Sequence, residues 1–92
     1  MSLQIFQESN VYHLQGNLTD TTSENAFMYF NEQLKNKSEL ALNLDKVEKI
    51  DVKGMATIND LVELAIKENK SFTVSGWGQK DVIEFFFLTD VA

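Results

Sequence analysis

The residues that could do chemistry are few and widely spaced. Asp45, Glu48 and Asp51 form a loose acidic group that could bind a cation weakly, although a solvated acidic loop explains it better. His13 is the only histidine, and no nucleophile motif or group of metal ligands accompanies it. A structural or exposed histidine is therefore favoured over a catalyst. The hydroxyl-rich run 19–22 is explained by helix capping.

The motifs of common enzymes are missing from the chain. There is no cysteine, which excludes disulfides, thiolate catalysis and cysteine metal sites. There is no phosphate-binding Gly-x-x-x-x-Gly-Lys, no Gly-x-Ser-x-Gly and no His-Glu-x-x-His. We therefore expect a protein that is not an enzyme, with no cofactor and no metal site. A small-ligand or nucleotide sensor would need convergent polar groups in a pocket, and the sequence indicates none.

Composition predicts one small soluble domain over residues 1–92. The chain is 43% apolar and 24% charged, as in ordinary globular proteins, and is too short for two cores. Its net charge of −6 disfavours binding to nucleic acid or to an anionic membrane surface. No apolar run approaches the roughly 20 residues that span a bilayer, and the start does not read as a secretory signal. We expect a cytoplasmic protein without direct membrane insertion.

The first half of the chain predicts a hairpin followed by a helix. Two short runs rich in strand-favouring residues, 3–7 and 11–15, flank a turn-like segment. Thr21 and Glu24 have the spacing of a capping box, in which each side chain satisfies a backbone N–H near the other. The helix is expected to continue to about residue 35.

The second half alternates strands and helices. The run 39–44 predicts a strand buried on both faces, 52–68 a helix, 71–75 a strand and 79–88 a final helix. Strand–helix–strand units favour parallel pairing, while the first hairpin supplies an antiparallel edge. The expected fold class is α/β, a mixed and mostly parallel sheet of about four strands with three helices packed on it.

A short apolar strand, a polar turn and a glycine precede the second helix, which Asp51 can cap. Leu42-x-Leu44 leads to Asp51-x-x-Gly54, with Gly16-x-Leu18 earlier and Val74-x-Gly76 later in the chain. In order and spacing these features resemble the STAS domain family, the sulfate-transporter and anti-sigma-factor-antagonist fold. The resemblance covers about residues 5–88 and implies a STAS-like fold and a bacterial regulatory module that binds proteins.

The turn departs from the family pattern at the position that the resemblance implies is phosphorylated. In the family a hydroxyl residue follows the aspartate, whereas here Val52 and Lys53 stand in the turn. A phosphate there would add about two negative charges at a helix N-terminus and would repel a docked partner. The chain is therefore expected to be non-phosphorylatable at this site. It is then either a constitutive binder, or one regulated through its partner, or a domain that has lost the old interaction.

Two surfaces are candidates for contact with a partner. One is a stripe along the second helix, beside the turn. Its residues, Lys53, Thr57, Asp60 and Leu64, are spaced by four, three and four positions and therefore lie on the same side of the helix. The alternative is an ordinary solvated face with one stray leucine. The candidate partner-binding residues are Asp51, Val52, Lys53, Gly54, Thr57, Asp60 and Leu64.

The second candidate surface lies near the end of the chain. Apolar residues on more than one side of the last expected helix suggest a homodimer or partner contact, and burial against the first helix is the alternative. The tryptophan of a Gly-Trp-Gly turn could also contact a partner. The residues of this second surface are Trp77, Ile83, Phe87 and Leu88.

The leading functional hypothesis is a non-enzymatic, cytoplasmic signalling module. By resemblance it would act like an anti-sigma factor antagonist, through protein-protein interaction with an anti-sigma-type kinase or a larger complex. The alternatives are a small STAS accessory subunit of a lipid-transport ABC system and a small-ligand sensor.

Overall fold

The computed structural model describes residues 2–76, which form one sheet and two helices. The four strands are hydrogen-bonded in the order β1-β2-β3-β4. The elements in chain order are β1 (Leu3–Glu8), β2 (Val11–Leu18), α1 (Ser23–Asn36), β3 (Glu39–Ile50), α2 (Val52–Lys67) and β4 (Ser71–Ser75).

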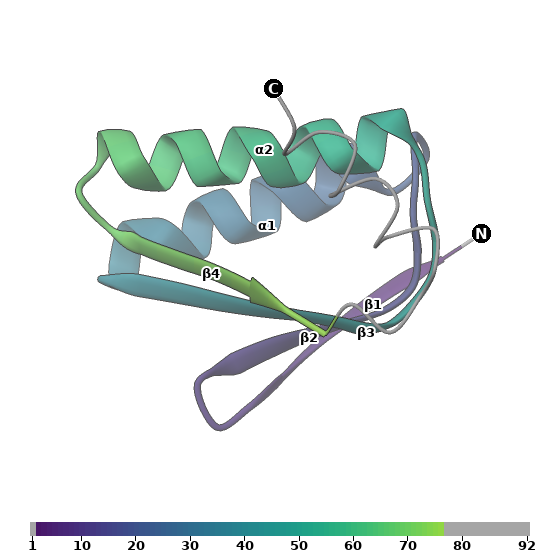
Figure 1. Cartoon of the computed structure of the whole chain (residues 1–92), viewed down its shortest axis with the longest axis horizontal. Coiled ribbons are helices and arrows are strands. Elements are labelled where there is room, and N and C mark those ends of the chain that lie inside the picture. Colours follow the sequence, from purple (N-terminus) through teal and green to yellow (C-terminus); the bar gives the residue numbers. More distant parts are fainter. Residues whose placement is uncertain (1, 77–92) are drawn as a thin grey trace.

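The sheet is mixed and mostly parallel, as predicted. Strand β1 pairs antiparallel with β2, while β2–β3 and β3–β4 are parallel pairs. Helices α1 and α2 lie side by side on the same face of the sheet (Figure 1). The third helix, expected over 79–88, lies outside the described residues.

The core lies between the two helices and the sheet face that they cover. Leu44 and Val47 of β3 are both 0% exposed, which makes this strand the centre of the buried layer. Helix α1 contributes Phe30 and Leu34, at the four-residue spacing of a helical face. The other buried apolar residues are Tyr12, Leu14, Leu18, Ala26, Leu40, Leu42, Ile50, Met55, Ile58, Leu61 and Ala65.

Strand β3 is longer than the apolar run predicts. The strand was expected to end at residue 44 and to be followed by a polar turn, but it continues to Ile50, and that expectation is wrong. The buried positions here are Leu44, Val47 and Ile50, spaced by three rather than two. The pairing with β2 shifts register twice along this stretch, so that β3 carries extra residues opposite β2. Such bulges turn a strand on its axis and let residues three apart face the same core.

The predicted capping box at the start of α1 is also wrong. The helix begins at Ser23 with Thr22 as its N-cap residue, and no side chain caps it. The Thr22 hydroxyl instead donates to the carbonyl of Asn17 at 2.7 Å and accepts from the N–H of Thr19 at 3.0 Å. The hydroxyl-rich run therefore organises the loop between β2 and α1 rather than the helix end.

Candidate functional site

The turn between β3 and α2 is built around the carboxylate of Asp51, the N-cap residue of α2. One oxygen, Oδ1, accepts a hydrogen bond from the N–H of Gly54 at 2.8 Å. The other, Oδ2, accepts from the N–H of Asp20 at 3.0 Å, in the loop that follows β2. Aspartate is among the preferred N-cap residues because it satisfies N–H groups that the helix leaves unpaired. Here it also ties two loops together.

Gly54 allows the first turn of α2 to approach the end of β2 closely. A Cβ at this position would lie 2.1 Å from the carbonyl oxygen of Leu18 and 3.0 Å from Cγ1 of Ile50. The same Leu18 carbonyl accepts a hydrogen bond from the Asp51 N–H at 3.3 Å. Any side chain larger than hydrogen would push the helix away from this carbonyl, so the contact explains the glycine.

The tip of the turn presents an apolar residue and a cation to solvent. Val52 is 73% exposed, and the neighbouring Lys53 is exposed as well. Neither side chain has a hydroxyl. No acidic residue stands in the first turn of α2, so the positive end of the helix dipole is balanced mainly by Asp51.

The predicted stripe along α2 is only partly on the surface. Asp60 is exposed, but Thr57 is buried with 8% of its surface accessible. Leu64 is half-buried against the core and lines a shallow groove with Asn31 and Leu34 of α1. Leu64 at the end of the stripe therefore lies beside α1, and the exposed part of the candidate surface is Val52, Lys53 and Asp60.

Sequence reasoning missed two parts of this surface. Ala56, Asn59 and Glu63 continue the exposed face of α2 from Val52, and their spacing of four, three and four residues could have identified them. The contact between Asp51 and Asp20 spans 31 positions and has no local signal in the sequence.

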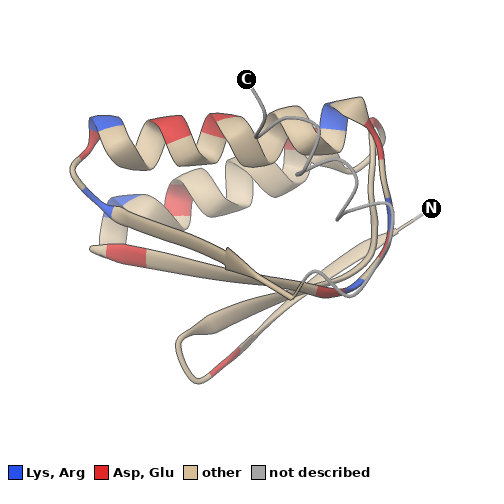
Figure 2. Ribbon diagram, viewed as in Figure 1, with Lys and Arg blue, Asp and Glu red and all other residues tan. Residues whose placement is uncertain are grey.

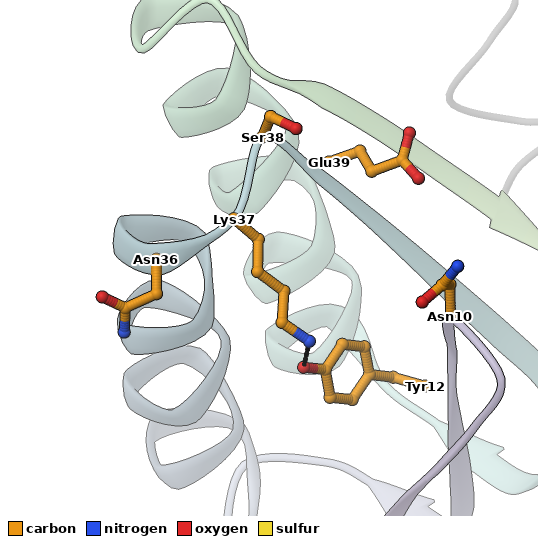
Figure 3. Close-up of a pocket in the computed structure, with 6 residues that line it drawn as sticks. All are labelled: Asn10, Tyr12, Asn36, Lys37, Ser38 and Glu39. Atoms are coloured by element: carbon orange, nitrogen blue, oxygen red, sulfur yellow. Dashed lines mark hydrogen bonds between the residues drawn. The ribbon is translucent and has the colours of Figure 1, made fainter.

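A pocket of about 320 Å³ lies at the other end of the sheet, where β2 and β3 begin. Figure 3 shows Lys37 reaching over to the hydroxyl of Tyr12, to which its Nζ donates. The same hydroxyl donates to the side-chain oxygen of Gln33 at 2.6 Å. These groups satisfy each other, and ligand sites of open α/β sheets lie at the opposite, carboxyl ends of the strands. We interpret the pocket as part of the scaffold.

Within residues 2–76 no three histidine, aspartate or glutamate side chains gather where they could hold a metal ion. In the same range no helix has the length and apolar character required to cross a membrane. The second candidate surface, Trp77, Ile83, Phe87 and Leu88, lies outside the described residues.

The comparison with protein families decides the classification. The model of the STAS domain matches residues 2–91, which is nearly the whole chain. The chain belongs to the STAS domain family. No curated protein matches it in sequence.

Solved structures share the STAS fold at low sequence identity. The anti-sigma factor antagonist SpoIIAA, in its unphosphorylated form, matches with a TM-score of 0.68 and 13% identity, over 95% of this chain and 82% of SpoIIAA. Mglu matches with a TM-score of 0.63 and 22% identity over 77% of this chain. The chain spans only 18% of Mglu. Another Mglu structure, which is an L-glutamate binding form, matches with a TM-score of 0.56 and 16% identity, over 77% of this chain and 25% of that one.

Proposed function

We propose that this STAS domain is a non-enzymatic, cytoplasmic regulatory module that binds a protein partner, in the manner of an anti-sigma factor antagonist. The binding surface is the Asp51–Gly54 turn together with the exposed face of α2. The partner is an anti-sigma or kinase-like regulator, alone or in a larger complex.

The observation that carries the proposal is the exposed tip of a firmly held turn. Both carboxylate oxygens of Asp51 are engaged in backbone hydrogen bonds, so the backbone beneath the tip is fixed before any partner arrives. Val52 stands on it with 73% of its surface exposed, beside the charge of Lys53. A preorganised surface loses little conformational entropy on binding, and an exposed apolar residue beside a charge can give both affinity and specificity.

Phosphorylation of a serine or threonine in the turn does not switch this module under the proposal. Val52 and Lys53 have no hydroxyl, and Thr57, the first hydroxyl along α2, is buried. A kinase would have to unfold the first turns of the helix to reach it. Regulation would then come through the partner.

The test is affinity purification of the tagged protein from native lysate. Lys53→Glu and Val52→Asp change the tip, while Lys67→Glu makes the same charge change in the last turn of α2. An acidic residue near a helix N-terminus is stabilising by about 0.3–1 kcal/mol. Loss of a partner from Lys53→Glu therefore would not come from unfolding.

We expect one partner to be recovered with the wild type and with Lys67→Glu, and to be lost with both changes at the tip. Retention of the partner by both tip variants would rule out the turn as the binding surface. Recovery of a transport ATPase subunit, lost with the same variants, would keep the surface but favour the accessory-subunit alternative.

A further inference from the structure

Strand β1 forms one edge of the sheet and leaves half of its backbone groups without a neighbouring strand in the described part of the chain. The N–H of Asn17 donates to the carbonyl of Ser2 at 2.9 Å, so residue 2 directs its backbone groups toward β2. Backbone groups alternate in direction along a strand. Leu3, Ile5 and Gln7 therefore direct their N–H and C=O groups away from β2, toward the open edge.

This edge lacks the features that usually protect an exposed strand. Edge strands are commonly interrupted by proline, lysine or a bulge. Strand β1 reads Leu-Gln-Ile-Phe-Gln-Glu, with neither proline nor lysine, and its pairing with β2 runs from Leu3 to Glu8 without a register shift. Its free edge is thus a regular template for another strand.

A groove of about 350 Å³ runs between this edge and α1. Leu3 and Ile5 of β1 line it from one side, and Ala26 and Tyr29 of α1 from the other. One side of α1 faces Leu64 of α2, and this groove lies on the other side of α1. A strand added to β1 would direct every second side chain toward this groove, so apolar residues at alternate positions would fit it.

The charge around the edge selects the kind of segment. Glu8 is the last residue of β1, and Glu24 precedes Asn25, which lines the groove; residues 1–34 contain no lysine or arginine. Figure 2 accordingly shows no basic residue on β1 or β2. The ammonium group of Lys46, from β3, lies over the Phe6 ring at 5.0 Å from its centroid, on the sheet face opposite that of Leu3 and Ile5. A second copy of the chain has the same net charge of −6 and would be repelled. A basic segment would be attracted.

We propose that the open edge of β1 is a strand-addition site for an extended segment of a partner protein that is apolar at alternate positions and basic at its ends. Backbone hydrogen bonds to Leu3, Ile5 and Gln7 give the affinity, and the groove and the acidic surroundings give the selectivity. The site is separate from the Asp51–Gly54 turn.

The first test uses the wild-type protein and the peptide Lys-Val-Thr-Val-Thr-Val-Lys. Amide hydrogen exchange followed by NMR should slow at Leu3, Ile5 and Gln7 on addition of the peptide. The same peptide with N-methyl groups at alternate residues cannot form the ladder, and a peptide with glutamate at both ends has the wrong charge. Both should leave these amides unchanged. Equal protection by the glutamate peptide, or no protection at these three amides with the lysine peptide, would overturn the proposal.

The second test changes the edge itself. Gln7→Pro removes an N–H that faces away from β2 and adds a ring on that side, so the pairing with β2 is kept. Gln7→Ala loses the same side chain but keeps the N–H, and serves as the matched control. We expect Gln7→Pro to weaken binding of the lysine peptide about tenfold and Gln7→Ala to leave it unchanged. Equal affinity of the two variants would contradict addition at this edge.

Discussion

At the scale of single residues, Asp51 holds the turn because each of its carboxylate oxygens accepts a different backbone N–H. The bond to Gly54 caps α2, and the bond to Asp20 joins the turn to the loop after β2. The capping role was predictable from the sequence, since an aspartate precedes a long amphipathic segment. The second bond was not, because Asp20 is distant in the chain and only the fold brings the two residues together.

Replacing Asp51 by alanine should destabilise the domain by about 1–3 kcal/mol, since it removes a helix cap and a second hydrogen bond. Urea denaturation would measure the change in the free energy of unfolding. Asp60→Ala removes an exposed acidic residue from the same helix and should stay within about 0.5 kcal/mol of the wild type. An effect of Asp51→Ala no larger than that of this control would contradict the role of the carboxylate.

Replacing Gly54 by alanine should also destabilise the domain, by about 1–3 kcal/mol, although alanine is the better helix former. The added Cβ would meet the Leu18 carbonyl, a backbone atom that cannot move without shifting β2. Ala56 is exposed and lies half a turn further along the helix, so Ala56→Gly measures the difference in helix propensity alone. It should lower the free energy of unfolding by about 1 kcal/mol. A stabilising Gly54→Ala, measured by thermal unfolding, would show that the close approach is not rigid.

At the scale of elements, local patterns located most of the described strands and helices, and long-range pairing decided the rest. Strand β4, Ser71–Ser75, has the bounds that its apolar alternation predicts. The second half of β3 was missed because Leu44, Val47 and Ile50 are three apart, a spacing that no regular strand has. These three residues face the core only because the pairing with β2 shifts register twice, and that pairing cannot be read from the sequence of β3 alone.

Because β3 lies at the centre of the core, shortening one of its buried side chains should lower the stability of the domain most. Leu44→Ala should destabilise the domain by about 2–5 kcal/mol, because the side chain is 0% exposed and its loss leaves a cavity. Ile66→Ala removes a similar volume from α2, where the side chain is 69% exposed, and should change stability by less than about 0.5 kcal/mol. Chemical denaturation of the two variants compares them directly. Similar losses would contradict the assigned core.

At the scale of the whole molecule, the position of α1 beside α2 determines which part of the predicted surface a partner can reach. The periodicity of α2 predicts a stripe of Lys53, Thr57, Asp60 and Leu64 on the surface, but Thr57 is buried and Leu64 packs against the core. The periodicity cannot reveal that a neighbouring helix covers part of that stripe, since this depends on how α1 crosses the sheet. The reachable surface is therefore the turn and the outward face that begins at Val52.

The most direct test of this surface is photo-crosslinking in native lysate, with a benzophenone amino acid placed at Val52 or at Ile66. The two positions lie at opposite ends of α2. Their side chains are almost equally exposed, at 73% and 69%, so a crosslinking group at either position is equally accessible to another protein. We predict a covalent adduct with one partner from position 52 and none from position 66. An adduct from position 66 alone, or from neither position, would contradict binding through the Asp51–Gly54 turn.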